Sequence, residues 1–202
     1  MRRGGAIAAG RPAARRRGRA GAWCMLALAF LLAFAHTGVR ADADATAAEY
    51  RLKAAFLFKF LGFVEWPPAV LERPDSPFVI GVLGAKTMGD ELAQTVVGRQ
   101  VAGHPVLVRV LAHADSTAGL QVLFIGRAEA ARVPAVVAAA DSQPLLVVTE
   151  SDAGLAAGSA INFVVVDDKV RFDIALHPIE RAGLKVSARL LAVARNVLPN
   201  PS

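Results

Sequence analysis

The stretch INFVVVDDKVRFDI, residues 161–174, decides how the second half of this chain folds. Two arms rich in Val, Ile and Phe flank the polar residues Asp167-Asp168-Lys169, which is typical of a β-hairpin and its tip. In the second arm, apolar residues alternate with Arg171 and Asp173, as expected of a strand with one buried face. The stretch therefore predicts an antiparallel pair of strands.

Upstream of the hairpin, apolar strand patterns alternate with helical patterns. We predict strands at residues 78–83, 105–111, 120–125 and 144–149, and helices at residues 90–97 and 128–140. Strand–helix–strand units favour parallel pairing, whereas the hairpin is antiparallel. We therefore expect an α/β fold, a single-domain sandwich with a mixed β-sheet and helices on both faces. Residues 184–186 are a candidate for a further strand of this sheet, and Ser187 is a good N-cap for a last helix over residues 188–197.

The first 41 residues have the composition of an export signal. They hold eight arginines and no acidic residue, and the apolar block at residues 23–35 follows most of the arginines. This block has about the length of a signal-peptide core and is short for a membrane span. We expect cleavage near Ala41 and export to the periplasm, with an uncleaved anchor as the alternative. Residues 1–41 would then be a signal peptide, residues 42–49 a flexible lead-in and residues 50–198 the folded domain.

Removal of the signal changes the charge and the redox chemistry of the protein. The whole chain has 23 basic and 17 acidic residues, but all eight signal arginines are lost, which leaves a net charge of −2. No basic stripe remains, so we expect no nucleic-acid binding. Cys24, the single cysteine, also lies in the signal. The mature protein can therefore form no disulfide, and we expect no stable membrane insertion after cleavage.

Catalytic and metal-binding patterns are missing from the sequence. His104, His113 and His177 do not form a metal-ligand spacing with one another. Gly81, Gly84 and Gly89 follow a predicted strand but match neither the dinucleotide motif nor the P-loop. We therefore predict a protein that is not an enzyme, with no catalytic, cofactor or metal site.

The stretch KAAFLFKFLGFVEWP, residues 53–67, concentrates aromatic residues in a predicted helix over residues 49–65. We expect Phe56, Phe60 and Phe63 to form its buried face. A helix that is apolar on nearly all sides is either buried all round or shared with a partner. The candidates for a dimer or partner contact are Phe58, Leu61 and Trp66 here, and Arg171 and Asp173 on the exposed arm of the hairpin.

Three stretches in order resemble the YfiR family of periplasmic regulators, and the resemblance covers about residues 50–197. They are KAAFLFKFLGFVEWP at residues 53–67, VLFI at residues 122–125, and residues 161–191, which include INF, VRFDI and AGLKVS. The resemblance implies a periplasmic α/β protein that binds the periplasmic part of an inner-membrane diguanylate cyclase and inhibits it. Less cyclic di-GMP is then made, and biofilm formation is restrained.

The resemblance also implies a homodimer without a cofactor. Well-studied relatives carry disulfides, and Gly81 and Leu120 stand about where their cysteines are expected, so redox control is in doubt here. The alternative function is a periplasmic small-ligand-binding domain that reports to a membrane receptor. That function predicts a concave apolar pocket with a few convergent polar groups.

Overall fold

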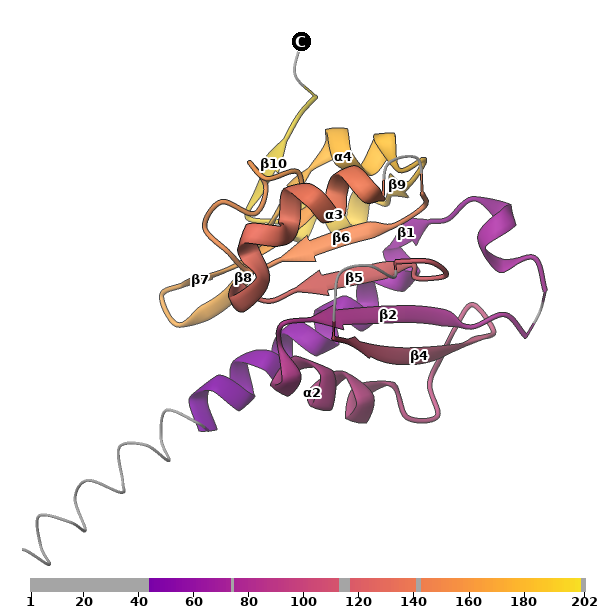
Figure 1. The fold of residues 1–202 in the computed structure, drawn as a ribbon, viewed down its shortest axis with the longest axis horizontal. Coiled ribbons are helices and arrows are strands. Elements are labelled where there is room, and N and C mark those ends of the chain that lie inside the picture. The colour runs from indigo at the N-terminus through magenta and orange to yellow at the C-terminus, as the bar shows by residue number, and fades with distance from the viewer. Residues whose placement is uncertain (1–43, 74, 113–116, 141–142, 201–202) are drawn as a thin grey trace, which may run out of the picture. The chain divides into compact units, whose positions relative to one another are not determined.

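An eight-stranded mixed sheet runs through the folded unit, Ala45–Ser202 (Figure 1). The computed structural model describes residues 44–73, 75–112, 117–140 and 143–200. In sheet order the strands are β10 (Asn196–Leu198), β8 (Lys169–Ala175), β7 (Ile161–Val166), β6 (Leu146–Thr149), β5 (Val122–Ile125), β2 (Phe78–Leu83), β4 (His104–Leu111) and β3 (Gln100–Val101). Strands β4, β2, β5, β6 and β7 are parallel to one another, whereas β8 is antiparallel to β7 and β3 is antiparallel to β4. The predicted mixed α/β fold is confirmed.

The central strands are apolar on both faces because helices cover both faces of the sheet. Phe78, Ile80 and Val82 of β2 point into a core that is shared with the N-terminal helix (residues 44–63), α2 (Lys86–Val96), α4 (Leu176–Arg181) and α5 (Ala188–Val193). Val79 and Leu83 point the other way, against α3 (Val133–Ala139). This alternation follows from the period of two in a strand. Figure 1 shows α3 lying across β5 and β6.

The predicted hairpin is confirmed, with β7 and β8 paired over six residues each and Phe163 opposite Phe172. At its tip Asp167 and Asp168 have φ values of 49° and 56°. Positive φ at both central residues is what a two-residue hairpin turn with the right twist requires. The expected exposure of Asp173 is wrong, because β10 pairs beside it and covers it.

The N-terminal helix is already formed at residue 44, before the expected start at Glu49, so the described part of the expected lead-in is helical. The helix ends at residue 63, where Val64–Glu65 form the short strand β1. β1 pairs with β9 (Lys185–Val186) as a separate two-stranded sheet. The candidate strand at residues 184–186 therefore does not extend the main sheet.

Two other helices differ from their predicted bounds. α2 begins at Lys86, ahead of the predicted start at Asp90. The segment predicted as one helix over residues 128–140 is divided into a 3₁₀ helix, η2 (Arg127–Arg132), and α3. Pro134 lies in the first turn of α3, a position where the missing N–H of proline is not needed.

The last described element is a strand and not a helix. Ser187 caps α5 as predicted, because its Oγ accepts a hydrogen bond from the amide of Leu190 at 3.3 Å. α5 nevertheless ends at Val193, and β10 follows it in parallel pairing with β8. Val197 is therefore a strand residue with 38% of its surface exposed, and the prediction that the last helix extends to residue 197 is wrong.

Candidate functional site

The buried face of the N-terminal helix differs from the predicted face of Phe56, Phe60 and Phe63. Its fully or nearly fully buried members are Lys53, Ala54, Leu57, Phe60 and Leu61. Phe56 and Phe63 pack against the core but stay partly exposed. Leu61 is only 1% exposed, so its prediction as a partner contact is wrong: the side chain is used in the core of the protein itself.

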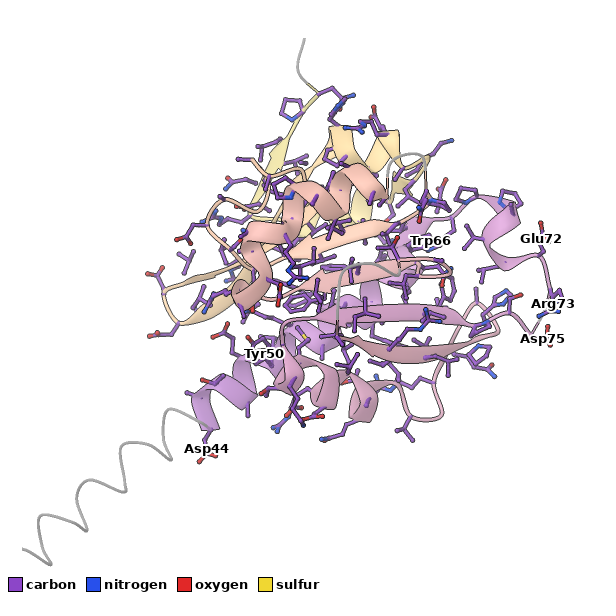
Figure 2. The ribbon with its side chains drawn as sticks, in the orientation of Figure 1. Asp44, Tyr50, Trp66, Glu72, Arg73 and Asp75 are labelled. Carbon is purple, nitrogen blue, oxygen red and sulfur yellow. The ribbon has the colours of Figure 1, made fainter. Side chains whose placement is uncertain are left out.

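Phe58 and Trp66 are half-buried and keep exposed surface. The guanidinium carbon of Arg99 lies 5.4 Å from the ring centroid of Phe58. The indole N–H of Trp66 donates to the carbonyl of Leu61 at 3.0 Å, and its ring meets that of Phe78 at 5.8 Å between centroids. Trp66 lies just past the end of the helix (Figure 2). The assignment of Phe58 and Trp66 as partner contacts remains a prediction.

Asp173 is engaged within the protein. Its carboxylate accepts hydrogen bonds from Nε of Arg195 at 2.8 Å, from a terminal nitrogen of the same guanidinium, and from the side-chain amide of Asn196 at 3.1 Å. With 7% of its surface exposed, Asp173 holds β10 against β8. The prediction that it faces a partner is therefore wrong, whereas its neighbour Arg171 is exposed.

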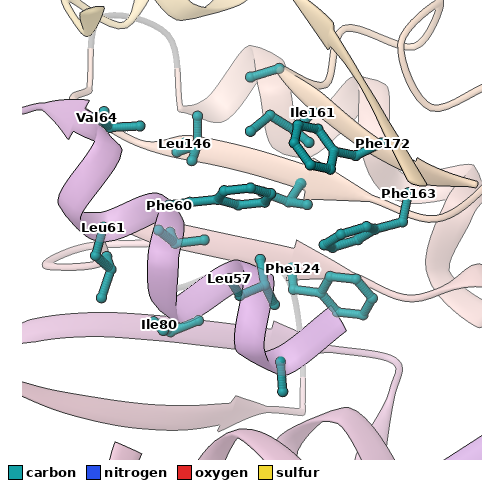
Figure 3. Packing of buried hydrophobic residues seen from close by; sticks show 14 of the residues in the cluster. Leu57, Phe60, Leu61, Val64, Ile80, Phe124, Leu146, Ile161, Phe163 and Phe172 are labelled. Atoms are coloured by element: carbon teal, nitrogen blue, oxygen red, sulfur yellow. The ribbon is translucent and has the colours of Figure 1, made fainter. Parts of the chain in front are cut away.

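A groove of about 420 Å³ opens between the N-terminal helix, β8 and α5. Its lining is apolar except for three cations, and it comprises Phe56, Lys59, Phe60, Phe63, Val170, Arg171, Phe172, Arg189, Leu190 and Val193. The rings of Phe56 and Phe60 lie 5.4 and 5.2 Å from that of Phe172, in edge-to-face contact. In Figure 3 the rings of Phe60 and Phe172 project toward each other between the helix and the sheet.

The cations of the groove are Lys59, Arg171 and Arg189, and all three are exposed. Among the residues that the structure describes, no acidic one lines the groove. Within the described ranges, none of the three forms an ion pair or a side-chain hydrogen bond. Sequence reasoning found Arg171 but missed the groove, because its charges come from three elements that are distant along the chain.

A second polar cluster lies between the N-terminal helix and the carboxyl end of β6, and it too was not predicted. Glu150 accepts hydrogen bonds from Nζ of Lys53 at 2.5 Å, from the hydroxyl of Tyr50 at 2.9 Å and from the backbone N–H of Arg127 at 3.3 Å. Lys53 also donates to Glu49. The signals in the sequence were a lysine inside an aromatic helix and a glutamate directly after an apolar strand.

This cluster is internally satisfied, which is typical of a structural role. Burial, followed by the charge of Glu150, raises the pKa of the Tyr50 hydroxyl well above its ordinary value. The phenol therefore stays protonated and continues to donate to Glu150. In the described part of the chain, every buried side-chain nitrogen and oxygen has a hydrogen-bond partner, and His, Cys, Asp and Glu residues form no group of three that could hold a metal ion.

Gly81 and Leu120, the positions compared above with cysteines of relatives, lie against each other. A Cβ atom added at Gly81 would come within 2.6 Å of a methyl carbon of Leu120. The leucine side chain thus fills the space that the glycine leaves on β2. No described helix is long and apolar enough to cross a membrane.

The chain folds as a single α/β domain that carries an apolar groove with a positively charged rim. Residues 50–195 match the model of the YfiR/HmsC-like family, and the chain belongs to this family. The family is regulatory and not catalytic, its members are periplasmic, and they act with a membrane signalling partner.

No curated protein matches the chain in sequence. Among solved structures, a similar one is described as the ABC domain in complex with L-Trp from Streptococcus pneumonia. The match has 14% sequence identity and a TM-score of 0.47, and it covers 60% of this chain and 55% of that chain. The chain thus spans about half the length of this structure.

Proposed function

We propose that the mature protein is a periplasmic regulator that binds the periplasmic part of an inner-membrane diguanylate cyclase and holds the enzyme inactive. Cyclic di-GMP then falls, and biofilm formation is restrained. The observation that carries this proposal is the family match over residues 50–195. The proposal includes export, with cleavage of the signal near Ala41, and a homodimer as the functional form.

An inhibitor without chemistry of its own acts by binding one conformation of its partner better than another. It can shift the partner's equilibrium by no more than this difference in affinity. A hundredfold preference for the inactive cyclase corresponds to about 2.7 kcal/mol. A few large side chains in the interface are enough to supply such a difference.

Deletion of the gene tests this function in cells. We expect cyclic di-GMP to rise on deletion and to fall again when the parent protein is restored to the periplasm. A form without residues 1–41, which stays in the cytoplasm, is the control and should not restore inhibition. Mass spectrometry of the periplasmic protein should give a chain that starts near Asp42. Unchanged cyclic di-GMP in the deletion strain would contradict the proposal.

The groove favours a second candidate function, a small-ligand-binding domain that reports to a membrane receptor. Its apolar lining and three cations fit the concave pocket with a few polar groups that such a domain needs. Under this function, deletion would change the receptor's response to a ligand, whereas cyclic di-GMP in the absence of ligand would stay the same.

A further inference from the structure

We propose that the groove between the N-terminal helix, β8 and α5 receives an acidic amphipathic segment of the partner protein. Apolar side chains of this segment cover the aromatic floor, and its carboxylates pair with Lys59, Arg171 and Arg189. The inference rests on the proposed function, because it assigns the chemistry of the segment by which the partner is recognised.

The floor of the groove is apolar and held in place before any partner binds. Phe172 is buried, and its ring is fixed by edge-to-face contacts with Phe56 and Phe60. Beside it, Phe63 is half-buried and Val193 is 63% exposed, so apolar surface is open to solvent. Covering this surface is favourable, and a floor that is already ordered loses little conformational entropy on binding.

The rim of the groove carries positive charge that nothing in the described part of the chain compensates. Several cations elsewhere on the fold form ion pairs with carboxylates, as in the pairs Arg51–Glu91, Lys86–Asp90 and Arg132–Glu129. The three groove cations lack such partners, although the mature chain as a whole has two more acidic than basic residues. Complementary charge on a partner would steer its approach and fix its register.

The combination of an apolar floor and a cationic rim favours an amphipathic segment over nucleic acids and small polar anions. A nucleic acid or a small polar anion would neutralise the rim but would leave the phenylalanine floor in water. A helix with an apolar stripe at i, i+3, i+4 and i+7 and acidic flanks would satisfy both, because such helices dock their stripe into apolar grooves. The cations come from three elements around the floor, so the flanking carboxylates can be engaged on more than one side.

Two labelled peptides test the inference directly. Both carry the same leucine stripe, one with glutamate flanks and the other with lysine flanks. Fluorescence anisotropy with the exported, processed protein should show binding of the glutamate peptide that weakens as salt is added, and at least tenfold weaker binding of the lysine peptide. Equal affinity for the two peptides, or no binding of the glutamate peptide, would overturn the inference.

Charge-reversing substitutions of groove cations test whether the glutamate peptide binds in the groove. Arg171→Glu and Arg189→Glu should each weaken binding of the glutamate peptide about tenfold or more and improve binding of the lysine peptide. The matched control is Arg109→Glu, an exposed cation on β4 that lies outside the groove and near the other edge of the sheet. The control should bind like the parent. An equal loss in the control would show general charge attraction and would contradict the assignment.

Two other occupants are distinguished by parallel measurements. If laurate binds and the glutamate peptide does not, the groove is a site for small amphiphiles and the inference is wrong. If sedimentation velocity shows a dimer that Arg171→Glu dissociates, and the peptide does not bind, the groove joins two copies and the inference is again wrong.

Inhibition of the cyclase separates the inference from the proposed function. If the parent protein inhibits the cyclase and Arg171→Glu and Arg189→Glu inhibit it equally well, the function stands and the groove assignment falls. If the parent does not inhibit but binds the glutamate peptide, the groove is an acidic-segment site and the cyclase proposal falls.

Discussion

Lys53 and Glu150 form a salt bridge with 2.5 Å between Nζ and Oε2, and neither side chain is exposed to solvent. The pair joins the N-terminal helix to the end of β6, across 97 residues of sequence. Removing one member of a buried pair leaves the other charge without compensation, and this typically costs about 3–5 kcal/mol.

Lys53→Met should therefore lower the free energy of unfolding by several kcal/mol, as measured by urea denaturation. The matched control is Lys86→Met, which breaks an exposed pair with Asp90 and should cost less than about 1 kcal/mol. The double variant Lys53→Met/Glu150→Leu removes both charges and should recover part of the loss. Equal stability of Lys53→Met and the parent would show that the pair contributes little.

Tyr50 is the only tyrosine in the chain, so the ultraviolet spectrum of its phenolate reports this one group. Burial and the neighbouring Glu150 raise its pKa, and the folded protein should titrate above the ordinary tyrosine pKa of about 10. Because the folded state holds this proton more tightly than the unfolded chain does, the contribution of Tyr50 to stability is complete below about pH 10. It is lost as the pH rises toward the folded-state pKa.

Urea denaturation at neutral and alkaline pH measures how much stability is lost when Tyr50 ionises. The parent should lose more stability in this range than Tyr50→Phe, which cannot ionise at this position. A folded-state titration of Tyr50 at the value of an unfolded control peptide would contradict the assignment.

Redox state should not affect the mature protein. Cys24, the single cysteine of the chain, lies in the segment that we propose is cleaved as a signal, and Leu120 fills the space beside Gly81. Thermal melts of the periplasmic protein with and without a thiol reductant should superimpose. A reductant-dependent midpoint would mean that Cys24 is retained and forms a disulfide between chains.

The ring of Phe172 contacts those of Phe56, Phe60 and Phe163. Figure 3 shows it beside Phe60 and Phe163. Phe172→Ala should cost about 3–5 kcal/mol, a large part of the stability of a domain, and should yield little folded protein. Val165→Ala, at an exposed position of the paired strand β7, should change the stability by less than about 0.5 kcal/mol. Normal expression and an unchanged melting temperature for Phe172→Ala would contradict the burial of this ring.

The elements that local sequence specifies were predicted well. β2 and the β7–β8 hairpin have continuous or alternating apolar patterns, and Ser187 is a strong N-cap, so each could be located without knowledge of the rest of the chain. The last strand could not be located in this way. Residues 194–197 continue a helical pattern, but residues 196–198 pair with β8, and the side chains of Arg195 and Asn196 bond to Asp173.

The candidate site was predicted less completely because it depends on contacts between distant segments. Asp173 alternates with apolar residues as an exposed residue would, and its partner Arg195 lies 22 positions away. Leu61 had no local signal that separated it from Phe58, and the packing of the helix on the sheet decided which of them was buried.

The most direct test of regulation by contact is the activity of the membrane cyclase in vitro. Membranes that contain the full-length cyclase are incubated with GTP and increasing amounts of the processed protein on the periplasmic side, and cyclic di-GMP is quantified. The account predicts that synthesis falls to a low plateau as the protein saturates the cyclase, with Arg109→Glu as effective as the parent. Synthesis that stays constant at saturating protein would contradict the central claim.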